Sequence, residues 1–81
     1  MEEITIRLFA AAAEAAGASE LRIPTPPTWG AAMDYLVAEF GAPMDKVLRA
    51  SACICCGERL SAESALSDDA VVEVLPPFAG G

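Results

Sequence analysis

Hydrophobic and polar residues alternate with a period of two at the start of the 81-residue chain. In residues 3–9 every second side chain is aliphatic, while Phe9 falls among the polar residues of the opposite face. Residues 20–23 alternate in the same way, and a proline-rich stretch follows them. This periodicity predicts two β-strands, the first covered on its aliphatic face. The aliphatic residues of the first strand are Ile4, Ile6 and Leu8.

A helical period replaces the alternation between Trp29 and Phe40, where apolar residues recur at i, i+3, i+4, i+7, i+8 and i+11. Such a stripe is typical of a helix lying on a sheet. Thr28 is a suitable N-cap, and Gly41 is a suitable residue to end the helix. The sequence therefore predicts one long helix with its stripe in the core. The stripe consists of Trp29, Ala32, Met33, Leu36, Val37 and Phe40.

The other predicted elements are shorter. Residues 10–16 are almost all alanine, which predicts a short helix, and residues 45–50 predict a further helical turn. A turn at Cys56-Gly57 would join two of the remaining strands. The last strand is rich in β-branched residues and suits a central position. These three strands are expected at residues 51–56, 58–60 and 71–75.

The order of elements indicates an α+β domain in two layers, with a mixed sheet of four or five strands and the long helix packed on one face. If the aliphatic face of the first strand meets that helix, the first and last strands are central neighbours. We expect one domain over residues 1–75 and a flexible tail over residues 76–81.

The charge narrows the range of partners. Twelve acidic and five basic residues give a net charge of −7, which argues against nucleic acid or an anionic membrane as partner. No apolar run approaches the roughly 20 residues of a spanning helix, and no secretory signal is visible. Three cysteines in one cluster make a poor disulfide framework, so we expect a reducing, cytoplasmic location.

The catalytic inventory is small. The chain has no histidine, no glycine-rich phosphate loop and no serine nucleophile motif. Cys53 and Cys55 fall on one face of a predicted strand and Cys56 on the other, with no fourth ligand for a structural zinc ion. We expect Cys53 and Cys55 to pack as small hydrophobic residues and no metal to be bound. A thiol or metal function of the three cysteines is the alternative.

The chain ends Pro76-Pro77-Phe78-Ala79-Gly80-Gly81. Two prolines end the last strand, because each lacks the N–H that a sheet requires. The glycine pair has no Cβ, so its carboxylate could enter a narrow channel in another protein. A carboxylate is a poor acyl donor, so a partner enzyme would first have to activate it with ATP. Ordinary fraying of a terminus is the alternative.

The chain resembles the MoaD-like branch of the ThiS/MoaD sulfur-carrier group, which has the β-grasp (ubiquitin-like) fold. Residues 74–81 carry the most specific part of this resemblance, a Pro-Pro step before a hydrophobic residue and a terminal Gly-Gly. Residues 4–10, the helix that begins at Thr28, and residues 57–60 also match. The chain departs from the family at Cys56-Gly57, where Asn-Gly is frequent.

The resemblance implies a non-catalytic subunit of a molybdopterin synthase. Gly81 would be adenylated by an E1-like (MoeB-like) enzyme with ATP and Mg²⁺, and a cysteine desulfurase or rhodanese would supply the sulfur of a thiocarboxylate. The tail would enter a large (MoaE-like) subunit and give sulfur to cyclic pyranopterin monophosphate, and two such transfers would form the dithiolene. The chain itself would bind no cofactor. Its partner interface would include Phe9, Leu75 and Phe78.

Two other functions share the same activation chemistry. One is a sulfur carrier for thiamin, tungsten-cofactor or cysteine synthesis. The other is a ubiquitin-like modifier whose Gly81 is joined to a lysine amine.

Overall fold

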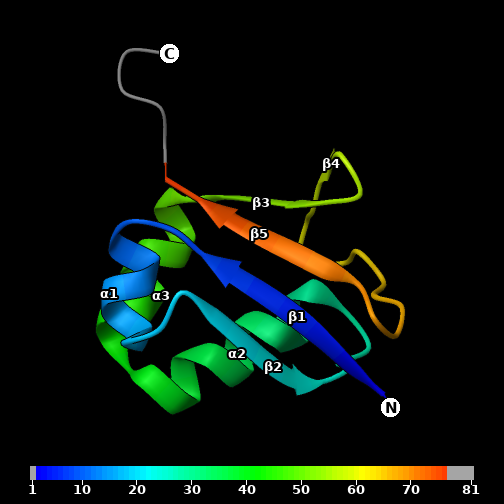
Figure 1. The fold of residues 1–81 in the computed structure, drawn as a ribbon, viewed down its shortest axis with the longest axis horizontal. Coiled ribbons are helices and arrows are strands. Elements are labelled where there is room, and N and C mark those ends of the chain that lie inside the picture. The colour runs from blue at the N-terminus through cyan, green and yellow to red at the C-terminus, as the bar shows by residue number, and fades with distance from the viewer. Residues whose placement is uncertain (1, 77–81) are drawn as a thin grey trace.

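The computed structural model describes residues 2–76, and within them five strands form one mixed sheet in the order β2-β1-β5-β3-β4 (Figure 1). Strand β5 lies at the centre, parallel to β1 and antiparallel to β3. Strands β2 and β4 pair antiparallel at the two edges. This confirms the predicted α+β fold and the neighbouring positions of the first and last strands. The bounds are β1 Glu3–Leu8, β2 Glu20–Pro24, β3 Ala52–Cys55, β4 Glu58–Arg59 and β5 Val71–Leu75.

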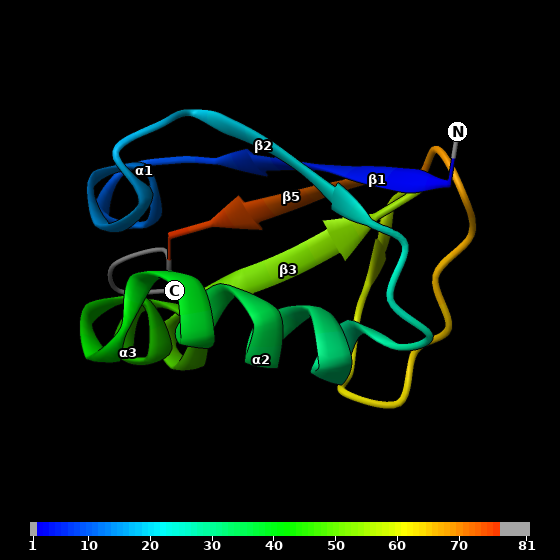
Figure 2. The same ribbon diagram turned by 90° about the horizontal axis from the view of Figure 1, so that it is seen from below.

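Helices α2 and α3 lie along one face of the sheet, while α1 lies at the end of the sheet that β1 leads to (Figure 2). The helices are α1 Ala11–Ala16, α2 Trp29–Phe40 and α3 Ala42–Ala50. The predicted long helix and the short helix expected over residues 10–16 are both present, whereas the single turn expected over residues 45–50 is a full helix, α3. Pro43 lies in the first turn of α3, where its missing N–H has no cost, so this proline begins a second helix of nine residues. In the described residues 2–76, no helix has the length and hydrophobicity to cross a membrane.

The core forms between the sheet and the helices. The predicted faces are confirmed, because the aliphatic residues of β1 and the centre of the α2 stripe are at most 2% exposed. From α3, Met44 and Leu48 complete this layer. The fully buried side chains of largest volume are Trp29, Ile4, Ile6, Leu8, Leu36, Met44, Val72 and Val74.

Local signals behave as predicted at the ends of the helices. The Oγ1 of Thr28 accepts a hydrogen bond of 3.2 Å from the Ala31 N–H, which caps α2. Gly17 ends α1 in the left-handed conformation with φ 71°, and its N–H donates to the Ala13 carbonyl at 2.8 Å.

A loop after β4 is fixed to the start of α2. The Trp29 N–H donates to the Ser64 carbonyl, and the Gly30 N–H donates to the Ala62 carbonyl, both at 2.9 Å. A Cβ on Gly30 would lie 2.9 Å from that carbonyl oxygen, so only glycine allows the loop to approach so closely. The loop therefore covers the N-terminal end of α2, at the opposite end of the molecule from the end of β5 (Figure 1).

Candidate functional site: the end of the central strand

The candidate site begins where β5 ends. Leu75, the last residue of β5, pairs with Ala52 of β3, and Pro76 follows as a half-buried residue. The predicted strand end is therefore correct. The other site residues predicted from the sequence, Pro77, Phe78, Ala79, Gly80 and Gly81, lie outside the described residues.

The central strand gives this site a fixed base. Strand β5 pairs with β1 over four residues and with β3 over four residues, so residues 72–74 are paired on both sides and Leu75 is paired with β3. Val72 and Val74 point into the core and are fully buried. The position of Pro76 is therefore set by the most enclosed strand of the sheet.

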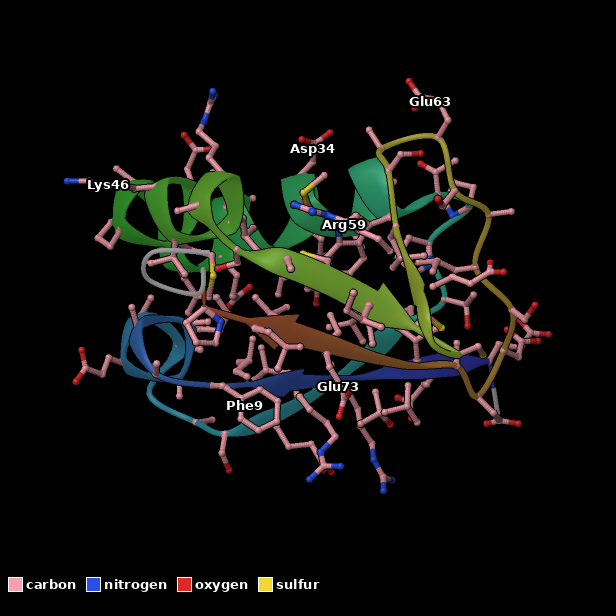
Figure 3. All side chains as sticks on the ribbon, turned by 90° about the horizontal axis from the view of Figure 1, so that it is seen from above. Phe9, Asp34, Lys46, Arg59, Glu63 and Glu73 are labelled. Carbon is pink, nitrogen blue, oxygen red and sulfur yellow. The ribbon has the colours of Figure 1, made fainter. Side chains whose placement is uncertain are left out.

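The sheet face opposite α2 is mixed in character. The alternate residues of β5 point to this face: Val71 is 46% exposed, and Leu75 is half-buried. Figure 3 shows Phe9 and Glu73 on the same side of the sheet, away from the helices. Two of the predicted interface residues thus lie on one face: Phe9 directly follows β1, and Leu75 is the last residue of the neighbouring strand β5.

Arg7 contacts both an acidic and an aromatic side chain on this face. The Arg7 Nη1 lies 4.0 Å from the Glu73 Oε2, and the Arg7 guanidinium carbon lies 5.9 Å from the centroid of the Phe9 ring. Both contacts are exposed, so each stabilises the fold only slightly. They hold Arg7 across the face, so that apolar side chains and a balanced ion pair lie next to each other there.

The three cysteines differ in burial: Cys53 is buried, Cys55 is half-buried and Cys56 is exposed. Cys53 is buried, and this burial raises the pKa of its thiol, against the weaker effect of its hydrogen bond with Trp29. Burial also raises the pKa of Cys55, and the neighbouring Cys56 thiol adds to that shift. The two Sγ atoms of Cys55 and Cys56 lie 3.8 Å apart. Over residues 2–76, no group of three Cys, Asp, Glu or His side chains could hold a metal ion.

Comparison with protein families identifies the family of the chain, which the geometry of the site alone does not. The model of the ThiS family matches residues 6–81, which includes the whole Gly-Gly tail. The chain belongs to the ThiS family. No curated protein sequence matches the chain.

Solved structures of archaeal proteins share the fold. The small archaeal modifier protein 1 (SAMP1) of Haloferax volcanii is 26% identical, with 98% of this chain and 99% of that chain covered and a TM-score of 0.79. SAMP1 of Methanosarcina acetivorans is 23% identical, with 100% and 98% covered and a TM-score of 0.82. A candidate molybdopterin converting factor subunit 1 of Pyrococcus furiosus is 19% identical, with 96% and 100% covered and a TM-score of 0.78.

These matches confirm the predicted β-grasp, ubiquitin-like fold and the resemblance to the ThiS/MoaD group. The chain is thus a sulfur carrier or ubiquitin-like protein of the ThiS/MoaD type. Proteins of this type act with E1-like enzymes and synthase-type partners.

One part of the site was missed by the sequence reasoning. Helix α3 lies against the start of α1 beside Pro76, although only a helical turn was expected there. The spacing of Met44, Val47 and Leu48 at i, i+3 and i+4 was the available signal, and it predicts a helix with one buried face.

Proposed function

We propose that this chain is the sulfur-carrier small subunit of a molybdopterin synthase and that the Gly81 carboxylate is the carrier group. The observation that supports this best is the ThiS family match, which extends through the C-terminal glycine. The Pro-Pro step before the hydrophobic residue and the Gly-Gly end favours the molybdopterin branch.

The proposed chemistry takes place on the carboxyl carbon of Gly81. A carboxylate oxygen attacks the α-phosphate of Mg²⁺-bound ATP in a MoeB-like enzyme, and pyrophosphate leaves. A sulfur nucleophile then attacks the acyl carbon, and AMP leaves. If the nucleophile is a persulfide on a cysteine desulfurase or rhodanese, a thiol must next reduce the S–S bond to free the thiocarboxylate. Two thiocarboxylated chains would in turn each give one sulfur to cyclic pyranopterin monophosphate in the large, MoaE-like subunit. Water would hydrolyse each acyl–sulfur bond, leaving the sulfur on the pterin and returning Gly81 to a carboxylate.

In this proposal the folded body supplies binding surfaces and no catalytic group. Phe9 and Leu75 lie on the sheet face next to the end of β5, and with Phe78 they would pack against the large subunit. Apolar side chains beside a paired Arg7 and Glu73 suit an interface with an apolar centre and a polar rim. A cytoplasmic location agrees with the free thiols of Cys53, Cys55 and Cys56.

The test is intact mass spectrometry after incubation with a MoeB-like enzyme, Mg²⁺-ATP and a persulfide donor. We expect a mass gain equal to the exchange of one oxygen for sulfur, located on Gly81 by fragmentation. Deletion of Gly81 should abolish the gain without changing the melting temperature. A Cys53/Cys55/Cys56→Ser variant that remains folded should keep it. Sulfur found on a cysteine in place of Gly81 would refute the proposal.

The molybdopterin branch needs a second step in the same assay. The thiocarboxylated chain is mixed with a MoaE-like subunit and cyclic pyranopterin monophosphate, and the loss of sulfur from Gly81 is followed together with dithiolene formation. A thiocarboxylate that forms but is not consumed would support a carrier for thiamin, tungsten-cofactor or cysteine synthesis.

A second candidate function is protein modification. It is supported by the 26% identity, over nearly the whole of both chains, with a protein described as a small archaeal modifier. Here a lysine ε-amine would attack the Gly81 acyl-adenylate, and AMP would leave as an isopeptide bond forms. Tagged chain in cell extract would then give ATP-dependent conjugates that resist thiols. Their absence, together with thiocarboxylate formation, would favour the carrier.

A further inference from the structure

Two neighbouring thiols lie where β3 turns into β4. Cys55 is the last residue of β3, and Cys56 is the first residue of the two-residue turn that follows. Their Sγ atoms lie 3.8 Å apart, with the Cys55 side chain half-buried and the Cys56 side chain exposed. An exposed thiol in contact with a second thiol is the arrangement of an attacking and a resolving cysteine. The sulfur-carrier chemistry proposed above uses neither of them.

A hollow of 420 Å³ opens beside the two thiols. This volume admits a small organic molecule. Among the described residues that line the hollow, every charged side chain is acidic: Glu58, Asp68 and Asp69. The chain as a whole carries a net charge of −7. A positively charged molecule is therefore attracted to this hollow, and a negatively charged one is repelled.

We propose that Cys55 and Cys56 form a thiol-exchange site, which a small cationic disulfide converts reversibly into a Cys55–Cys56 disulfide. The Cys56 thiolate attacks one sulfur of the incoming disulfide, and half of that molecule leaves as a thiolate. The Cys55 thiolate then attacks the Cys56 sulfur of the mixed disulfide, and the other half leaves. The chain loses two electrons and two protons, and the small disulfide is reduced to two thiols.

Exposure decides the order of the two attacks. Burial raises the pKa of the Cys55 thiol, so less of it is thiolate at neutral pH, whereas the Cys56 side chain is exposed beside the hollow. Once Cys56 carries the mixed disulfide, Cys55 reacts within the same molecule and at a high effective concentration. The mixed disulfide is therefore short-lived.

The internal disulfide is strained, which makes it reversible. The peptide bond between the two cysteines is trans, so their Cα atoms are about 3.8 Å apart. Ordinary disulfides join Cα atoms about 4.4–6.8 Å apart, and a bond outside this range is reduced more easily. The dithiol is therefore the resting form in a reducing compartment, and the disulfide forms when the ratio of small disulfides to thiols rises.

The thiol-exchange site lies away from the end of β5. Cys55 pairs with Val72 near the start of β5, whereas Leu75 at the end of β5 pairs with Ala52 (Figure 1). The experiments below need no activating enzyme, so their outcome is independent of whether Gly81 carries sulfur.

Intact mass spectrometry of the reduced, dilute chain treated with cystamine tests the two steps. The wild type should lose the mass of two hydrogen atoms, and alkylation in urea should then label Cys53 alone. Cys55→Ser should stop at the mixed disulfide and gain one cysteamine group. Cys56→Ser should react about tenfold more slowly, because its remaining candidate thiol is half-buried.

Cys53→Ala is the matched control, because Cys53 is buried and should take no part in the exchange. It should lose two hydrogen atoms at the wild-type rate, and each variant is first shown by circular dichroism to be folded. A wild type that keeps the mixed disulfide as long as Cys55→Ser does would overturn the proposal. Loss of the internal disulfide in Cys53→Ala, or chains joined in pairs, would also overturn it.

A comparison of oxidants tests the charge of the hollow. Relative to a free Cys-Cys peptide, the folded chain should prefer cystamine over anionic glutathione disulfide, and salt should weaken this preference. Asp68→Asn combined with Asp69→Asn should also weaken it, whereas Glu63→Gln, outside the hollow, should not. Excess cysteamine should restore the dithiol. A preference equal to that of the free peptide, or a disulfide that resists cysteamine, would refute the assigned site.

Discussion

Among the described glycines, Gly30 is the one at which an added Cβ would come closest to another atom, and its replacement tests how the body of the protein is held together. In Gly30→Ala, the new Cβ would meet the Ala62 carbonyl oxygen at 2.9 Å and the Ala62 Cβ at 3.2 Å. A distance under 3.0 Å to a backbone atom cannot be relieved by rotating a side chain, so the loop that begins at Ser61 must move away from α2.

The magnitude follows from what that movement breaks. Overpacking costs about 1–3 kcal/mol. Weakening the hydrogen bonds from Gly30 to Ala62 and from Trp29 to Ser64 costs about 1 kcal/mol each. Alanine in place of glycine in a helix returns at most about 1 kcal/mol. The net destabilisation is therefore about 3 kcal/mol, which lowers the melting temperature of a domain of this size by about 15 °C.

The assay is thermal and urea unfolding followed by circular dichroism, with two companions. Ala38→Gly in the same helix measures helix propensity alone. Ala62→Gly combined with Gly30→Ala removes the contact with the Ala62 side chain but leaves the carbonyl oxygen, so the double variant should recover less than half of the loss. A Gly30→Ala protein as stable as the wild type would show that the loop yields without cost, and would refute the reasoning.

Other substitutions test local backbone and burial. Ala10 adopts φ 52°, ψ −124° before α1, a conformation that favours glycine, so Ala10→Gly should stabilise the fold by about 1 kcal/mol in urea unfolding, and a loss of stability would contradict the assigned strain. Cys56 has φ 55° in the two-residue turn after β3, where asparagine is favoured, so Cys56→Asn should raise the melting temperature by a few degrees, about 0.5 kcal/mol. Burial raises the pKa of the Cys53 thiol in the folded protein. The stability that the buried neutral thiol contributes is therefore fully present below the pKa of the unfolded state, and it is lost as the pH rises through the pKa of the folded state. The free energy of unfolding should therefore fall above about pH 8.5 in the wild type and fall less in Cys53→Ala. Equal slopes in the two proteins would exclude Cys53 as the source.

The sequence predicted the parts of the fold that depend on one periodicity. The alternation around Ile6 and the stripe around Leu36 set the buried face of β1 and α2, because each side chain on those faces must be covered. Thr28 and Gly17 marked the ends of helices through hydrogen bonds that the local sequence can supply. These are short-range effects, and a single sequence contains them.

Helix α3 had a local signal in the spacing of Met44, Val47 and Leu48, and it follows α2 after one glycine with Pro43 in its first turn. The other missed features depend on residues that are distant in the sequence. The contact between α1 and α3 beside Pro76 combines residues from three separate parts of the chain, so no local pattern announces it. The loop contact at Gly30 is also a property of the packed molecule, because Ala62 belongs to a distant part of the chain.

The parallel pairing of β1 and β5 also determines how the molecule responds to force. The residues from Thr5 to Leu8 lie beside those from Val71 to Val74, and the two strands run in the same direction. Tension applied between the start of β1 and the end of β5 would therefore slide one strand along the other, and the hydrogen bonds of this pair would carry the load together. If a partner draws the end of the chain into a channel, the pull is transmitted along the centre of the sheet. The edge strands β2 and β4 are spared, so the body can remain folded while its end is held under tension.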